Sequence, residues 1–277
     1  MIGIACGKRM IVLEATPGVP GSPESIIYTS CFRDRTEASF ILGLDIYVGS
    51  FTRYYSGEWE LVAARAAREL GAKFEVIRQH NPPDAIRDPD EIRRIILDWR
   101  SGLATSLASH LPEPLDWDES PAAPYFTDKP AWDGYQGLLL WAAYEEHSDL
   151  RVPTELPKDF AKDPAIQRSM GDNCRTVYQA LLSNAQFWLP ARFPFVFDAP
   201  DASGKKVTMA SSVSLAQELN ELNRKTWNLT DSELDQCAFD GCPAGSPLEV
   251  AARFGFALFR RHALLSVTHR LPMLLDW

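Results

Sequence analysis

The sequence predicts a helix-rich α+β fold, with one domain that contains a small sheet and a β-hairpin in the C-terminal half of the chain. Helix-start signals followed by apolar residues at helical spacing recur along the chain. Short apolar runs typical of strands are fewer. Hydrophobic residues make up 45% and charged residues 23% of the 277 residues, which is ordinary for a soluble globular protein with a full core.

The first 42 residues are patterned differently from the rest. The tract from Pro17 to Pro23 is rich in proline and glycine, which disfavour helices and central strands. The apolar pieces on either side, Met10 to Leu13 and Ser25 to Tyr28, keep no sustained period. We therefore predict an irregular N-terminal extension over residues 1–42, packed loosely on a single α+β domain over residues 43–277.

The domain is expected to open with a strand, a helix and a second strand. The apolar run Leu44 to Val48 predicts the first strand, Glu58 to Leu70 the helix, and Lys73 to Arg78 the second strand. The residues between the first strand and the helix are expected to form a polar loop.

Four helices are marked by a capping residue followed by proline, a pattern typical of a first helical turn. They begin near Asp88, Thr127, Asp163 and Ser246. The second of these is apolar on nearly all sides, which indicates a central, enclosed helix. The third carries apolar residues in line from Ile166 to Leu181, which predicts one continuous helix.

The hairpin is predicted from two strand-like runs on either side of a polar turn. The runs are Phe193 to Phe197 and Lys206 to Ser211, and the turn contains Pro200 and Gly204. A helix over Leu215 to Trp227 is expected to follow, because its leucines keep helical spacing.

The first candidate ligand site is the polar segment after the first strand. It gathers Asp45, Arg53, Tyr54, Tyr55 and Glu60. An arginine fork can bind a carboxylate or phosphate, and tyrosines can stack or donate hydrogen bonds. The structural alternative is that Arg53 pairs with Asp45 while the acidic residues favour the start of a helix.

The second candidate group lies at the start of the helix near Thr127. Asp128, Lys129 and Asp133 stand there among aromatic residues, although capping and the helix dipole also explain both carboxylates. His80 follows a predicted strand and is the histidine best placed for a cleft. If both segments meet in space, they would form a small-ligand or acid–base site.

Several chemistries lose their usual support. The chain lacks the common short motifs of nucleotide binding, zinc proteolysis and α/β-hydrolases. A net charge of −9 disfavours nucleic acid and anionic membranes as partners. Five cysteines form an odd, sparse set that is typical of a reducing compartment, so a cytoplasmic location is expected.

A zinc site is also disfavoured. Cys237 and Cys242 could combine with His262 and His269. However, the two histidines lie about 10.5 Å apart along a predicted helix, and zinc ligands lie within about 2.3 Å of one ion. We therefore predict no metal site, no disulfide and no cofactor.

A resemblance adds to these observations. The segment Gly43-Leu44-Asp45-Ile46-Tyr47-Val48-Gly49-Ser50, followed by Thr52-Arg53-Tyr54-Tyr55, resembles an uncharacterised bacterial protein family whose members typically begin close to Met-Gly-Leu-Asp. The resemblance covers about residues 43–190 and implies no particular activity. It also implies that Leu42 marks a candidate start, in which case residues 1–41 would be an annotation artefact.

Two functions from different classes follow as hypotheses. The first is a stoichiometric protein-binding or inhibitor protein, such as the immunity partner of a bacterial toxin, with a basic protein partner. The alternative is a small-molecule hydrolase or transferase with an Arg/Tyr/carboxylate site. An acidic chain without catalytic motifs fits the first slightly better.

Overall fold

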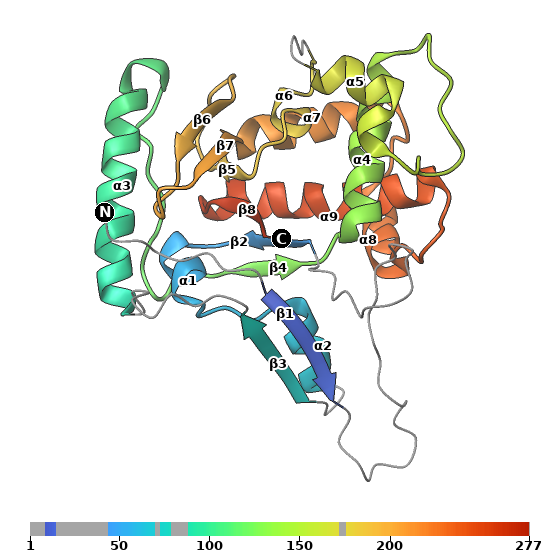
Figure 1. Ribbon diagram of the computed structural model, residues 1–277. Coiled ribbons are helices and arrows are strands. Elements are labelled where there is room, and N and C mark those ends of the chain that lie inside the picture. Colours follow the sequence, from blue (N-terminus) through green and yellow to red (C-terminus); the bar gives the residue numbers. More distant parts are fainter. Residues whose placement is uncertain (1–8, 15–43, 70–72, 79–87, 172–175, 277) are drawn as a thin grey trace.

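The computed structural model describes residues 9–14, 44–69, 73–78, 88–171 and 176–276. In this part of the chain, helices and strands mix as predicted in one α+β domain (Figure 1). The helices are α1 (Phe51–Ser56), α2 (Val62–Glu69), α3 (Pro89–Leu107), α4 (Ala131–Glu146), α5 (Pro164–Met170), α6 (Gln179–Leu182), α7 (Ser212–Lys225), α8 (Asp231–Asp240) and α9 (Leu248–His269).

The strands form two separate sheets. They are β1 (Arg9–Glu14), β2 (Asp45–Val48), β3 (Lys73–Arg78), β4 (Phe126–Asp128), β5 (Phe187–Leu189), β6 (Phe197–Pro200), β7 (Lys206–Ser211) and β8 (Met273–Asp276). The main sheet has the order β4-β2-β8-β5-β7-β6. Its neighbours are antiparallel except for the parallel pair β5–β7.

Helices cover both faces of the main sheet. Successive side chains of its central strands therefore point into two different cores, one on each face. Ile46 and Val48 of β2 pack with α4, α7 and α9, whereas Tyr47 packs with α1 and α3. In β8, Leu274 takes the side of Tyr47 while Met273 and Leu275 take the other. These short strands are therefore buried on both faces, which explains their continuous apolar sequences.

The enclosed helix predicted near Thr127 is α4, and its packing on α9 is unusually close. Nine residues of α4 are buried. A Cβ added at Gly255 would collide with the carbonyl oxygen of Gly134, and one at Gly137 would lie 2.8 Å from the amide nitrogen of Ala252. Glycines at the crossing thus let the two backbones approach each other directly.

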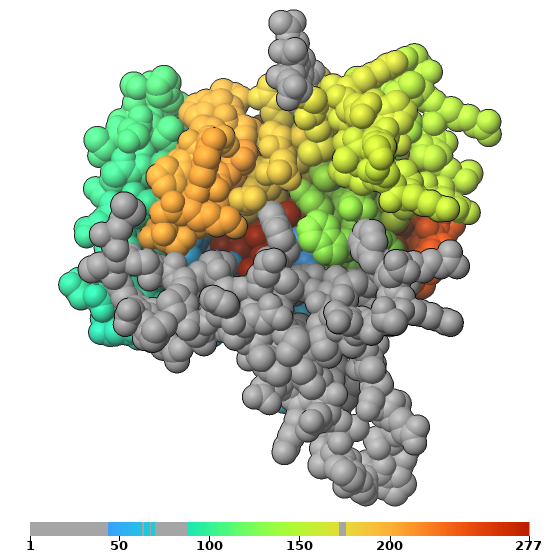
Figure 2. Space-filling view, in the orientation of Figure 1, coloured from blue at the N-terminus to red at the C-terminus, as the bar shows by residue number. Residues whose placement is uncertain are grey.

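The hairpin in the C-terminal half is confirmed as β6–β7, with Phe197 opposite Met209 and Pro200 opposite Lys206. Its first strand spans Phe197–Pro200 and not Phe193 to Phe197, so Pro200 belongs to the strand and not to the turn. Figure 2 shows this hairpin, in orange, beside α3 in green. The indole of Trp99 on α3 donates a hydrogen bond to the Pro200 carbonyl oxygen at 2.9 Å, which ties the two elements together.

Other predicted elements also differ from the structure. The polar loop after β2 is the helix α1, and the next helix begins at Val62 instead of Glu58. The continuous helix expected from Asp163 to Leu181 is wrong, since α5 ends before Gly171 and Val177 is exposed. The strand-helix-strand order around α2 is present, but its two strands lie in different sheets: β2 belongs to the main sheet and β3 pairs with β1.

The N-terminal segment is described only over β1. These six residues form a strand that is antiparallel to β3, in register from Arg9–Arg78 to Glu14–Lys73. This pair is separate from the main sheet. The tract from Pro17 to Pro23 lies outside the described residues, so loose packing of the extension stays a prediction.

Candidate functional site

The predicted polar segment is built around α1. Ser50 caps the helix, its Oγ accepting a hydrogen bond from the Arg53 amide at 3.3 Å, and Gly57 ends it with a φ of 75°. A left-handed backbone conformation at this position is most easily adopted by glycine. The Ser-to-Gly spacing therefore encodes one short helix and not a loop.

Arg53 holds a distant part of the chain against α1. Its guanidinium donates to the carbonyl oxygens of Ala123 at 2.6 Å and Pro121 at 2.5 Å. It also lies over the Tyr125 ring, 4.9 Å from the centroid. These contacts join the first candidate segment to the residues just before the second one. All of them are made within the protein itself, and they hold the two segments together.

The two tyrosines also bond within the fold. The Tyr54 hydroxyl donates to Asp276 of β8, and the Tyr55 hydroxyl donates to Asp201 in the hairpin turn, both at 2.9 Å. The short helix α1 is thus tied to the main sheet and to the hairpin at once.

The remaining candidates are dispersed. Asp45 is buried in β2, Asp128 lies opposite Ile46 at the far end of the β2–β4 pair, and Asp133 lies in the first turn of α4. The Asp128 carboxylate is 3.5 Å from the guanidinium of Arg261. Lys129, which is half-buried, follows β4 directly. His80 lies outside the described residues.

Glu60 lines a shallow pocket of about 370 Å³ together with Trp59 and Tyr125. Its carboxylate binds the Arg68 guanidinium through two hydrogen bonds of 2.9 and 3.0 Å. This pairing lowers the pKa of Glu60.

A buried carboxylate that the sequence reasoning missed supports α1 from below. Glu119 is 3% exposed and accepts hydrogen bonds from the amides of Phe51 at 3.0 Å and Thr52 at 2.8 Å. It also accepts a short one from the indole of Trp117. Because the interaction spans almost seventy positions in sequence, no local pattern predicts it.

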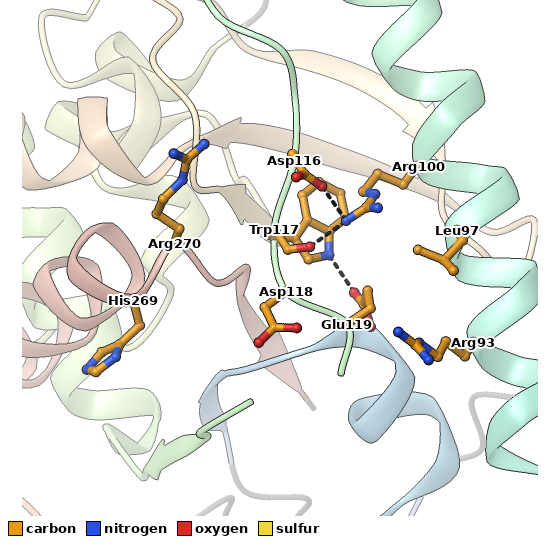
Figure 3. Close-up of a pocket in the computed structure, with 9 residues that line it drawn as sticks. All are labelled: Arg93, Leu97, Arg100, Asp116, Trp117, Asp118, Glu119, His269 and Arg270. Atoms are coloured by element: carbon orange, nitrogen blue, oxygen red, sulfur yellow. Dashed lines mark hydrogen bonds and ion pairs between the residues drawn. The ribbon is translucent and has the colours of Figure 1, made fainter. Parts of the chain in front are cut away.

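A larger pocket of about 460 Å³ lies beside this carboxylate (Figure 3). Residues of α3 stand on one side of the 116–119 segment and the end of α9 on the other. Its lining comprises Arg93, Leu97, Arg100, Asp116, Trp117, Asp118, Glu119, His269 and Arg270. Three arginines in one pocket make it a candidate site for a negatively charged ligand.

A third feature is the helix α8, which is acidic and carries an exposed aromatic ring. The Phe239 side chain is 85% exposed, the largest value among the exposed large hydrophobic residues that the structure describes. Asp231, Glu233, Asp235 and Asp240 on the same helix are all exposed, whereas Leu234 is its one buried residue. Asp231, Asp235 and Phe239 are four residues apart along α8 and therefore share one side of it, and we name these three residues the α8 face.

A polar network lies at the C-terminal end of α4. The Ser169 hydroxyl donates to Glu146 Oε2 and lies near His147 Nε2, at 3.1 Å in both cases. These are the residue types of a nucleophile, a base and an acid. However, Ser169 is 1% exposed and therefore cannot meet a substrate. His147 occupies the C-cap position of α4.

The residues considered for zinc do not form a common site. His262 is buried, which lowers its pKa, and its Nδ1 lies 2.9 Å from the Leu258 carbonyl oxygen. Burial raises the pKa of the Cys237 and Cys242 thiols, which are free. Among the described residues, no three His, Cys, Asp or Glu side chains are grouped closely enough to hold a metal ion.

No helix in the described ranges is both long and apolar enough to cross a membrane. Comparisons with protein-family models, curated proteins and solved structures found no match. The family resemblance of the segment from Gly43 to Tyr55 therefore stays a prediction.

Proposed function

We propose that this protein is a cytoplasmic, stoichiometric protein-binding protein, inhibitor-like in the manner of a toxin-immunity partner, and that the α8 face binds a basic protein. The observation that carries the proposal is the exposure of Phe239, 85%, on the acidic α8. Large aromatic side chains surrounded by polar groups are typical anchors of protein interfaces.

The charges of α8 favour a basic partner. Its sequence, Asp-Ser-Glu-Leu-Asp-Gln-Cys-Ala-Phe-Asp, contains four carboxylates and no lysine or arginine. Asp231 and Asp235 pair with Arg260 and Arg261 of α9 at 2.9 and 3.1 Å, yet their side chains stay 84% and 75% exposed. The two arginines therefore position these carboxylates without covering them.

In this proposal, burial of the Phe239 ring provides affinity for the partner, and the carboxylates of α8 provide selectivity for a basic one. Complete burial of a phenylalanine contributes roughly 2 kcal/mol. Complementary charges speed association and exclude partners of the same sign. The protein's net charge of −9 adds a long-range attraction for a basic partner.

The catalytic alternative receives less support. Arg53, Tyr54 and Tyr55 each direct their polar groups to carbonyl or carboxylate oxygens of the protein itself. A hydrolase or transferase built on these residues would have to break contacts that hold α1 in place.

The test compares Phe239→Ser with Val177→Ser, which removes an exposed apolar side chain from outside α8. Each purified protein is used to capture partners from cells that produce it, and captured proteins are then purified. We expect a basic protein that forms a 1:1 complex with wild type in light-scattering measurements. Its affinity should fall at least about tenfold with Phe239→Ser and with added salt.

Val177→Ser should bind this protein like wild type. Failure of wild type to form any 1:1 complex with a basic protein would contradict the proposal. So would a complex that tolerates Phe239→Ser.

A further inference from the structure

We propose that the pocket between α3, the 116–119 segment and the end of α9 binds a small organic anion, held by the guanidinium groups of Arg93 and Arg270. This site is separate from the α8 face, since no residue of α8 lines the pocket. It therefore adds a ligand to the proposed function and does not depend on it.

The carboxylates of the pocket already have partners. Asp116 pairs with Arg100 at 2.7 Å. Asp118 accepts hydrogen bonds from the Ser120 amide at 2.7 Å and the Ser120 hydroxyl at 3.0 Å. Glu119 is occupied by the amides at the start of α1. None of these three carboxylates forms an ion pair with Arg93 or Arg270.

Arg93 and Arg270 approach the pocket from opposite sides (Figure 3). The Nε of Arg93 is buried and has no hydrogen-bond partner within the described structure. Arg270 caps α9 in the left-handed region, with a φ of 52°, and its side chain is exposed. Neither guanidinium forms an ion pair with a described carboxylate, so both are available to a ligand.

Arg100 provides a fixed wall on the α3 side of the pocket, next to Arg93 (Figure 3). Besides its ion pair with Asp116, its guanidinium donates to the Trp117 carbonyl oxygen and lies 5.4 Å from the centroid of the Trp117 ring. This arrangement keeps one positive group in place near the two unpaired arginines. A ligand would therefore meet guanidinium groups beside a wall that the protein has already organised.

The walls define the chemical class of the ligand. Guanidinium forks match the oxygens of a phosphate or carboxylate. A volume of about 460 Å³ accommodates a small molecule. The lining is mostly charged, which favours a compact polar anion over an apolar one. A phosphate ester and a dicarboxylate share this chemistry.

The test measures binding of inorganic phosphate and of succinate by calorimetry, each at an ionic strength held constant with sodium chloride. We expect wild type to bind at least one probe saturably at one site per chain. Arg93→Gln and Arg270→Gln should each weaken that binding at least about tenfold. Phosphate binding alone identifies a phosphate ester, and succinate binding alone identifies a dicarboxylate.

The matched control is Arg94→Gln, which removes the same charge from the exposed neighbour of Arg93 on α3 without touching the pocket. It should bind like wild type. The proposal is wrong if wild type binds neither probe saturably, or if Arg94→Gln weakens binding as much as the pocket variants. Circular dichroism shows whether each variant folds. If Arg93→Gln does not fold, the result with Arg270→Gln, a change at an exposed position, decides whether the pocket binds the anion.

Discussion

Single side chains connect distant segments around α1. Arg53 binds backbone at Pro121 and Ala123, Glu119 caps the helix from the same stretch of chain, and Tyr54 reaches β8. A helix of six residues has little stability of its own. Its conformation therefore depends on these tertiary contacts.

We predict that Arg53→Ala destabilises the protein by about 2–3 kcal/mol, because it removes two charge-assisted hydrogen bonds and a cation–π contact. Urea unfolding measures the loss. Arg192→Ala, at an exposed arginine, is the control and should change stability by less than about 0.5 kcal/mol. If Arg53→Ala unfolds at the same urea concentration as wild type, these contacts are not required for stability.

Glu218 makes stability depend on pH. Its carboxylate accepts hydrogen bonds from the amides of Ala180 and Leu181 at 2.9 and 3.0 Å, and burial raises its pKa to about 7. The folded state therefore holds the proton at pH values where the unfolded state has lost it. This contribution is complete below about pH 4.5 and is lost as pH rises through 7.

We therefore predict that Glu218→Gln removes a pH-dependent loss on the order of 2 kcal/mol between pH 5 and 8. The difference between wild-type and variant unfolding free energies isolates it. This subtraction is needed because His262, whose pKa is lowered by burial, shifts stability in the opposite direction as pH rises. If the free energy of unfolding depends on pH in the same way for wild type and Glu218→Gln, Glu218 does not cause this pH dependence.

Among the elements, those with strong local signals could be predicted from the sequence. The helices α3, α4 and α9 begin next to their capping and proline signals. The split between α5 and α6 could not be predicted, because the apolar spacing continues across Gly171, where α5 ends. Strands β5 and β8 are three and four residues long, too short for a period to be visible.

In the candidate site, the sequence singled out Arg53 and its polar segment but could not show whether this segment meets the one near Thr127. In the structure Arg53 lies over the Tyr125 ring. It could not indicate Glu119, since that carboxylate acts on α1 only through the fold. Nor could it separate Phe239 from core phenylalanines, because exposure of one residue depends on how the whole helix packs.

The contact between α4 and α9 allows a prediction about packing. Gly255→Ala should destabilise the protein by more than about 3 kcal/mol, because the new methyl group would collide with the Gly134 carbonyl oxygen and force the helices apart. Thermal and urea unfolding measure this effect.

Gly102→Ala is the control for helix propensity. Gly102 lies within α3, and an added Cβ would meet no atom within 4 Å. This variant should gain about 0.5–1 kcal/mol. An equal effect of the two substitutions would exclude close packing as the cause.

For the molecule as a whole, the main sheet is complete without the N-terminal segment. Strand β1 pairs with β3, and neither belongs to the six-stranded sheet. We predict that a chain starting at Leu42, with methionine in its place, folds to the same stability within about 0.5 kcal/mol. Near-ultraviolet circular dichroism and urea unfolding test this, and a large drop in the midpoint would show that residues 1–41 support the domain.

The position of β8 has a consequence for biosynthesis. This strand, made last among those described, lies between β2 and β5 and joins the two halves of the main sheet. While the chain is still being translated, the pair β4–β2 and the group β5-β7-β6 therefore each present an unpaired edge. Exposed edges of this kind recruit other chains, and pairing over long sequence distances is slow. We therefore expect the edges of β2 and β5 to stay open to other chains until Met273 to Asp276 pair with both of them.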